Sequence, residues 1–316
     1  MKKQPNFFIV GAPKAGTTSL YHYLRQHPEI YMSPLKEPNY FASEIRPENF
    51  GAEFQEWVQR ETRELREYLC RPVLEQRFGG IVADWKDYLK LFEAVTAEKA
   101  IGEASVCYLW SRTAARNIFS AVPGAKLLMI LRNPADRAFS QYLHAVTNGW
   151  VRESFRARID VALGRGREPF GILNPFLEFG LYYEQVKRYL EFFPAANLRI
   201  YLFEDYQKQP GSVLADIFCF LDVDPSFEPN ISQRHLEPRI PRSVKLAYWL
   251  KRYGIWEGVR KISPPAVRSA FRTVAFRKRE SVLMDAEARK LLTVYYQDDV
   301  RQLSDLLCRD LNAWLS

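Results

Sequence analysis

Two glycines and a lysine near the start of the chain form a loop suited to binding phosphate. In GAPKAGTTSL, Gly11 and Gly16 have the spacing of the two glycines of a Walker-type loop. In such a loop Lys and then Ser or Thr follow the second glycine, and the lysine reaches the terminal phosphates. Here Thr17 and Thr18 follow, and Lys14 lies inside the loop. We therefore expect an anion site for a nucleotide that does not end in a triphosphate.

The segments on either side of this loop favour anion binding by the backbone. An apolar run precedes the loop and a helix-like segment follows it, so a helix N-terminus presents several N–H groups and the positive end of its dipole. Placed in the turn itself, Lys14 would meet the bridging or leaving oxygen of a 5′-diester rather than a γ-phosphate. We assign the following residues to the loop: Lys14, Ala15, Gly16, Thr17, Thr18 and Ser19.

A second group of candidate residues lies in LRNPADRAFSQY. Arg132 stands at the end of an apolar run, and Ser140 lies about two turns into the helix predicted after it. A guanidinium and a hydroxyl at this place can converge on a second anion. Alone, an arginine at a strand end is as often part of a surface salt bridge. Together with the first loop, the pair predicts a nucleotide with phosphates at both ends of its ribose.

Short apolar runs alternate with longer amphipathic stretches and thereby predict the elements that position these residues. The expected strands are Asn6–Val10, Ile30–Met32, Ile101–Glu103, Lys126–Leu131 and Leu198–Phe203. The expected helices are Thr18–His27, Trp85–Thr96, Pro134–Thr147, Leu181–Phe193 and Val213–Leu221. This alternation favours an α/β fold with a central parallel sheet flanked by helices, in which ligands bind beyond the carboxyl ends of the strands.

We interpret residues 1–316 as a single domain with three additions to its core. The core covers about 5–233, a basic segment covers 234–280, and Leu303, Leu307, Leu311 and Trp314 predict a C-terminal helix over 285–315. The charged stretch 43–80 is expected to be a lid or a surface excursion.

The basic segment carries the net charge of the protein. Thirteen Lys or Arg and two acids lie between Arg234 and Arg279, whereas the whole chain has a formal charge of +8. Aromatic and cationic residues interleave there, which is typical of a helix on an anionic membrane surface, of an acidic-ligand site, or of a solvated helical face.

Composition restricts the remaining classes of function. The chain is 47% hydrophobic and has no apolar run of membrane-spanning length, so we expect a cytoplasmic protein. Four widely spaced cysteines, Cys70, Cys107, Cys219 and Cys308, are expected to be reduced packing residues. No acidic cluster has metal-ligand spacing, so no metal is expected.

The motifs GAPKAGTTSL, KEPNYF, GEAS and LRNPADRAFSQY resemble those of sulfotransferases that use 3′-phosphoadenosine-5′-phosphosulfate (PAPS). The resemblance covers Asn6 to about Asp222 and is strongest to bacterial members similar to heparan sulfate glucosaminyl sulfotransferases. It implies a three-layer P-loop-like fold, with the 5′-phosphosulfate on Lys14 to Ser19 and the 3′-phosphate on Arg132 and Ser140. The product would be 3′,5′-adenosine bisphosphate (PAP).

The resemblance also implies a catalytic base. Glu37, in KEPNYF, matches the glutamate that takes the proton from the acceptor hydroxyl in the glucosaminyl enzymes. The alternative is a surface glutamate paired with Lys36. Because related cytosolic enzymes use a histidine, we also considered His22, His27, His144 and His235, none of which stands in a matching motif.

Two further segments bear on substrate binding. In GEASVCYLW, Ala104 and Val106 replace the Lys and Pro of the glucosaminyl enzymes, which argues against a heparan-like acceptor. Glu103 and Ser105 of the same segment are expected either to position the acceptor or to brace the loop. Trp85, Tyr88 and Trp110 are candidates to stack on a sugar or lipid-linked acceptor, or to pack in the core. In ISQRHLEPRIPRS, Arg239 or Arg242 is expected to close on the donor.

The predicted function is transfer of a sulfuryl group from PAPS to a hydroxyl of a carbohydrate, a glycolipid or another small molecule, and no nucleic acid partner is expected. A P-loop kinase or nucleotidase is the first alternative, but it requires a lysine at position 17. The second alternative is a non-catalytic module that binds an acidic glycan, membrane or nucleic acid through 234–279. Its binding would weaken steeply with salt.

Overall fold

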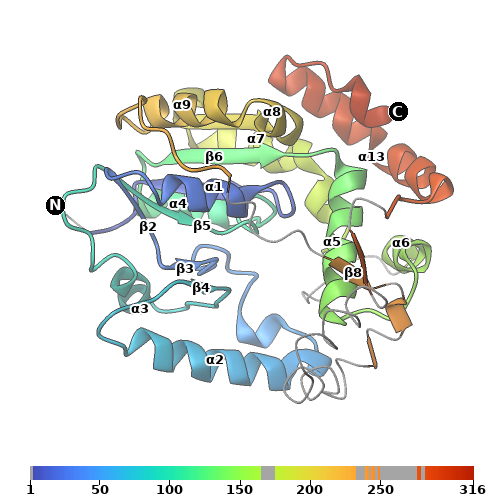
Figure 1. Cartoon of the computed structure of the whole chain (residues 1–316), viewed down its shortest axis with the longest axis horizontal. Helices are drawn as coiled ribbons and strands as arrows, with labels where there is room; N and C mark the ends of the chain where they lie inside the picture. Colours follow the sequence, from blue (N-terminus) through green and yellow to red (C-terminus); the bar gives the residue numbers. More distant parts are fainter. Residues whose placement is uncertain are drawn as a thin grey trace.

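The computed structural model describes residues 3–164, 175–232, 239–241, 243–245, 248–249, 276–278 and 282–316. Its centre is a five-stranded parallel sheet with helices on both faces (Figure 1). The strand order is β2-β5-β1-β6-β7, with bounds Ile30–Met32, Ala100–Ala104, Phe7–Gly11, Lys126–Leu131 and Leu198–Leu202. The predicted α/β class and parallel sheet are confirmed.

The middle strands form the buried centre of the molecule. All five residues of β1 are buried, and β1 pairs with β5 on one side and β6 on the other. A strand covered on both faces must be apolar along its whole length, as FFIV and LLMIL are. Because β1 and β6 are neighbours, the segments that follow them emerge side by side at one edge of the sheet.

Helices flank the sheet. They are α1 Thr17–Leu24, α3 Trp85–Lys90, α4 Ala114–Ala121, α5 Pro134–Asn148, α6 Phe155–Gly164, α7 Tyr182–Phe192, α8 Phe203–Lys208 and α9 Pro210–Phe220. Five of these helices, α1, α3, α5, α7 and α9, correspond to predicted ones, whereas α4, α6 and α8 were not predicted. The prediction for α3 is wrong at its C-terminal end, since turns replace the helix after Lys90. There the Glu98 carboxylate accepts the N–H groups of Thr96 and Ala97, which forms a local turn instead of a helix.

The stretch 43–80 is a folded addition. It contains the 3₁₀ turns Pro47–Asn49 and Ala52–Phe54, helix α2 (Gln55–Leu69) and strand β4 (Arg77–Phe78), which pairs in parallel with β3 (Leu35–Lys36). In Figure 1 this small sheet lies between α2 and the main sheet. Val58, Leu65 and Tyr68 are buried, so α2 packs with an apolar face rather than lying free on the surface.

The C-terminal helix is shorter than predicted. Helix α13 covers Ala286–Leu307, and Cys308 then adopts a left-handed conformation with φ 48°, which ends the helix. Leu311 and Trp314 are buried as expected, but from a separate 3₁₀ turn, Asn312–Leu315. Helix α13 packs against α7 and α5.

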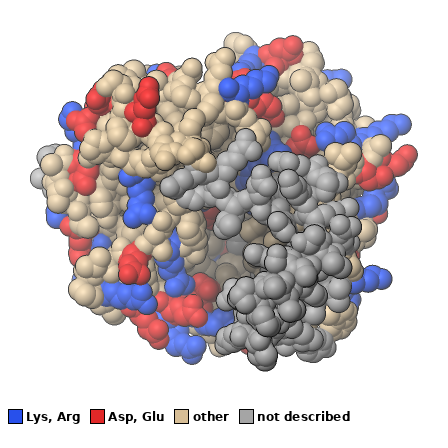
Figure 2. Space-filling model, in the orientation of Figure 1, with Lys and Arg blue, Asp and Glu red and all other residues tan. Residues whose placement is uncertain are grey.

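Most of the basic segment lies outside the described residues. The described part includes β8 (Arg239–Pro241), which pairs antiparallel with β9 (Phe276–Lys278). Elsewhere on the face shown in Figure 2, acidic and basic side chains are interspersed over the described surface. Among the described helices, none combines the length and hydropathy needed to cross a bilayer.

All four cysteines are free thiols, as predicted. Their expected packing role is wrong for Cys70, Cys219 and Cys308, which are exposed because they lie at a helix end or on the outer face of a helix.

Candidate functional site

The glycine loop connects β1 to α1 at the carboxyl edge of the sheet. Lys14 and Gly16 have positive φ angles of 65° and 87°, and Gly16 is the N-cap residue of α1. A Cβ atom at Gly16 would lie 3.1 Å from the ring of Phe203, so both the backbone conformation and the close ring favour glycine. The loop therefore ends at a helix N-terminus, the arrangement that suits an anion. Thr17 is buried there, whereas Thr18 is exposed.

Arg132 joins the two sequence motifs. It follows β6, and its Nη1 donates a hydrogen bond to the backbone oxygen of Lys14 at 3.0 Å. Its guanidinium also lies 4.7 Å from the centre of the Phe203 ring. Arg132 therefore contacts the glycine loop directly, and its convergence with Ser140 on a second anion stays a prediction. Ser140 lies buried on α5, the helix that starts two residues after Arg132.

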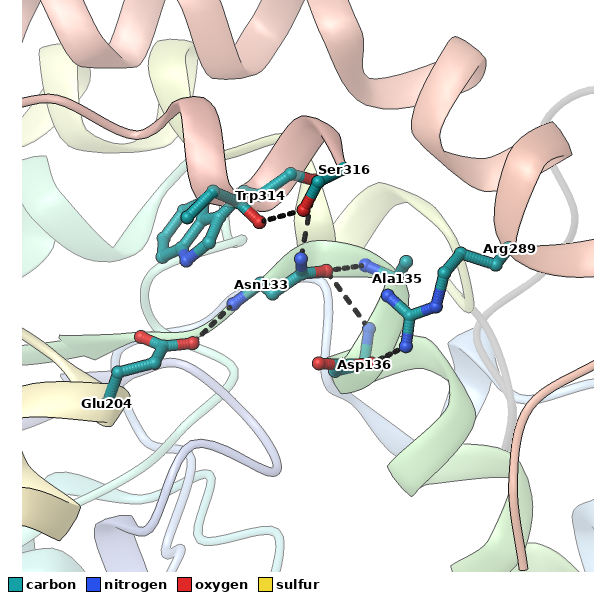
Figure 3. A network of polar contacts seen from close by, with 8 residues as sticks. Asn133, Ala135, Asp136, Glu204, Arg289, Trp314 and Ser316 are labelled. Atoms are coloured by element: carbon teal, nitrogen blue, oxygen red, sulfur yellow. Dashed lines mark hydrogen bonds and ion pairs between the residues drawn. The ribbon is translucent and has the colours of Figure 1, made fainter. Parts of the chain in front are cut away.

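Asn133 fixes the turn between Arg132 and α5 (Figure 3). Its Oδ1 accepts the N–H groups of Ala135 and Asp136, and its Nδ2 donates to the backbone oxygen of Trp314 at 3.3 Å. Asp136 pairs with Arg289 of α13 at 2.6 Å. We did not predict this role, although an Asn followed by Pro is a recognisable helix start.

Two residues far along the chain also support Arg132. The hydroxyl of buried Tyr182 donates to the backbone oxygen of Arg132 at 2.9 Å, and burial raises the pKa of this tyrosine. The carboxylate of Asp299, on α13, accepts the N–H groups of Tyr182 and Tyr183 at 2.8 and 3.1 Å. Burial raises the pKa of Asp299 to about 6. Nothing in the local sequence identifies either partner.

Glu37 stands where β3 ends, beside the strand ends of the main sheet. It has a left-handed φ of 69°, and its N–H donates to the backbone oxygen of Ala104 at 2.8 Å. Its Oε1 lies 2.6 Å from the Lys36 ammonium. Lys36 is 1% exposed and Glu37 is 32% exposed, so the carboxylate reaches solvent while its partner does not. The pairing with Lys36, which we gave as the alternative to a role as base, is present, and the role as base stays a prediction.

Glu103 lies fully buried behind Glu37 and is held by three hydroxyl groups. Tyr108, Ser105 and Tyr88 donate to its carboxylate at 2.7, 2.9 and 3.1 Å. Burial raises the pKa of Glu103 to about 7, against these hydrogen bonds, which lower it. Ser105 Oγ also accepts the N–H of Asn39 at 3.1 Å. Of the two roles considered for Glu103 and Ser105, these contacts support bracing of the Glu37 loop.

The described histidines lie in different surroundings, and His22 contacts the rings of Tyr21 and Phe78. His27 is buried between Phe218 and Phe227, with one ring nitrogen at 3.0 Å from the backbone oxygen of Asp224. His144 is exposed and contacts Trp150. His235 and Arg242 lie outside the described residues, as does the side chain of Arg239. The described residues contain no group of His, Cys, Asp and Glu able to hold a metal ion.

A model of the family described as "Sulfotransferase family" matches residues 5–229. The chain belongs to the sulfotransferase family. Among solved structures, the sulfotransferase from Alicyclobacillus acidocaldarius is similar over 99% of both chains, with 32% identity and a TM-score of 0.72. This confirms the resemblance seen in the motifs and the P-loop-like fold.

Curated relatives share the family at lower identity. The membrane-associated sulfotransferase kil1 of Dictyostelium discoideum is 24% identical over 79% of this chain and 62% of its own length. Human carbohydrate sulfotransferase 15 is 27% identical over 71% of this chain and 45% of its own length. Human bifunctional heparan sulfate N-deacetylase/N-sulfotransferase 3 is 27% identical over 98% of this chain and 31% of its own length. The chain therefore spans about a third to two thirds of the length of these relatives.

Proposed function

We propose that this protein transfers the sulfuryl group of PAPS to an acceptor hydroxyl. The contact between Arg132 and the Lys14 backbone carries the proposal, because it brings a second cation to the glycine loop that is predicted to hold the 5′-phosphosulfate. A kinase would need a lysine directly after Gly16, where this family member has Thr17. Membership of the sulfotransferase family supports the same donor.

In the proposed reaction the donor lies with its phosphosulfate on Lys14 to Ser19 and its 3′-phosphate on Arg132 and Ser140. Glu37 accepts the proton of the acceptor hydroxyl as the hydroxyl oxygen attacks sulfur in line. The bond between sulfur and the bridging oxygen breaks, and Lys14 with the loop N–H groups stabilises the charge that grows on that oxygen. Like phosphoryl transfer, this chemistry depends on placement and charge stabilisation.

The relatives named above include carbohydrate sulfotransferases, so a glycan, a glycolipid or another small hydroxyl compound is the proposed acceptor class. Three further points stay predictions: peripheral membrane contact through 234–279, closure of Arg239 or Arg242 on the donor, and a cytoplasmic location.

Calorimetry with PAP and with magnesium ATP tests the donor assignment. We expect PAP to bind tightly and ATP weakly. Arg132→Ala should weaken PAP about 10- to 100-fold, since a hydrogen bond to a charged group contributes about 1.5 to 3 kcal/mol. Arg199→Ala is the control, because Arg199 also lies over an aromatic ring, that of Phe220, at 4.5 Å. A preference for ATP, or no nucleotide binding by folded protein, would refute the proposal.

A further inference from the structure

Two partly exposed aromatic rings lie beside the turn that carries Glu37. Tyr40 comes three residues after Glu37, and Trp85 opens helix α3. Their ring centres are 5.3 Å apart, and each ring packs on buried Tyr88, at 4.7 Å for Tyr40 and 5.3 Å for Trp85. The interplanar angles to Tyr88 are 25° and 22°, so both outer rings are stacked on the same inner ring.

Hydrogen bonds hold these rings close to Glu37. The side-chain amide of Asn39 donates to the backbone oxygens of Glu37 and Gly80, at 2.9 and 3.0 Å. The N–H of Val82 donates to the backbone oxygen of Pro38 at 3.0 Å. The segment that leads to Trp85 is therefore tied to the turn between Glu37 and Tyr40. The inner ring is fixed as well, since Tyr88 donates to the buried carboxylate of Glu103.

Trp85 and Tyr40 differ from the other aromatic candidates. Tyr88 is fully buried, and the indole N–H of Trp110 donates to Glu178 at 3.0 Å. Both of those side chains serve the core or a neighbouring helix. Trp85 and Tyr40 are partly buried and lie at the margin of the hydrophobic core.

The two rings carry no charge themselves, and the carboxylates of Asp84 and Glu37 lie in the adjoining segments. Asp84 is exposed next to Trp85. Burial raises the pKa of Tyr40, the charge of Arg46 opposes this rise, and the charge of Asp84 adds to it with the smallest of the three effects. Lys86 is exposed beside Trp85, whereas two further cations of this region are engaged by other groups. Lys36 pairs with Glu37, and the Arg46 guanidinium donates to the backbone oxygens of Tyr40, Ala42 and Ile45. A carboxylate or sulfate on the acceptor would meet Asp84 and Glu37 here.

We propose that Tyr40 and Trp85 form an acceptor subsite for an uncharged ring compound that carries the reacting hydroxyl, such as a neutral pyranoside. The inference rests on the proposed function. Stacking against the rings holds the acceptor, since aromatic faces offer a large contact area and a preferred geometry. The hydroxyl then lies beside the carboxylate of Glu37.

A matched pair of acceptors tests the class of substrate. 4-Nitrophenyl β-glucopyranoside and 4-nitrophenyl β-glucuronide differ by one carboxylate, and release of PAP from PAPS reports transfer to either. We expect kcat/KM to be at least about tenfold higher for the glucoside, which is the size of one unfavourable charge contact. Equal or better use of the glucuronide would overturn the proposal, as would no transfer to the glucoside by protein that binds PAP.

Variants of Trp85 test the subsite itself. Trp85→Ala should raise the KM for the glucoside about tenfold while kcat and the Kd for PAP change little, and Trp85→Phe should recover most of the loss. Trp57→Ala is the control, since Trp57 is also partly buried against a ring, that of Phe50, but lies on α2. An unchanged KM in Trp85→Ala would overturn the subsite. Loss of PAP binding by unmodified protein would instead refute the proposed function.

Discussion

The pair of Lys36 and Glu37 allows the role of Glu37 in catalysis to be separated from its role in stability. Glu37→Gln removes the proposed base and also leaves the buried ammonium of Lys36 facing a neutral amide. Lys36 is 1% exposed, so water does not replace the lost charge. Lys36→Met has a smaller effect on the fold, because the Glu37 carboxylate is 32% exposed and can be hydrated. The double variant removes both charges.

The expected magnitudes follow from this asymmetry. Breaking a fully buried ion pair costs about 3 to 5 kcal/mol, but exposure of Glu37 and the remaining amide hydrogen bond reduce the cost of Glu37→Gln to about 2 kcal/mol. For a chain of this size that lowers Tm by about 4 °C. Turnover should fall about 10²- to 10⁴-fold, the usual contribution of a general base. Lys36→Met/Glu37→Gln should regain most of the lost Tm and none of the turnover.

Thermal unfolding and PAPS turnover of the four proteins form a double-mutant cycle. A double variant that is no more stable than Glu37→Gln would refute the energetic role of the pair. Turnover of Glu37→Gln within a factor of two of wild type would remove Glu37 as the base, and His144 would be the next residue to test.

Two other substitutions probe the site. Lys14→Ala should lower turnover about 10²-fold or more with Tm unchanged, because it removes a donor to the leaving oxygen. Lys187→Ala, at an exposed lysine, is the control and should leave turnover intact. A loss of turnover of only twofold in Lys14→Ala would exclude Lys14 from the mechanism. Glu103→Gln should change the pH dependence of stability. The folded pKa of about 7 lies above the ordinary 4.5, so the protonated form stabilises the fold below pH 4.5 and this contribution is lost as pH rises through 7. The Tm of the variant should therefore rise relative to wild type between pH 5 and 8, and a constant difference would show that Glu103 does not titrate there.

Local patterns were sufficient to predict the sheet and the loop. Strands β2 and β6 have the predicted bounds, because each is an apolar run between turn-forming residues. The motif around Lys14 was placed correctly at a strand end, since strand, turn and helix follow each other directly in the sequence. Helix ends were less predictable: Cys308 ends α13 in a left-handed conformation that no local composition required.

The partners of Arg132 could not be predicted in the same way. Tyr182 donates to its backbone oxygen from 50 residues along the chain, and Asp299 in turn accepts the N–H of Tyr182 across 117 residues. Asn133 bonds Trp314 across 181 residues. Such contacts depend on the order of strands and the docking of α13, for which a single sequence carries no periodic signal. The role of Glu37 as base is a prediction of the same kind, because it depends on where the acceptor lies.

Docking of α13 against α5 and α7 has a thermodynamic consequence for nucleotide binding. Arg289 of this helix pairs with Asp136 in the first turn of α5, which begins two residues after Arg132. Asp299 of the same helix holds Tyr182 at the start of α7, and Tyr182 donates to the backbone oxygen of Arg132. If α13 opens locally, the turn at Arg132 loses these supports, so the open form binds a 3′-phosphate less well. A ligand that prefers the closed form shifts the opening equilibrium by mass action. Bound nucleotide would then protect the amides of α13 from hydrogen exchange.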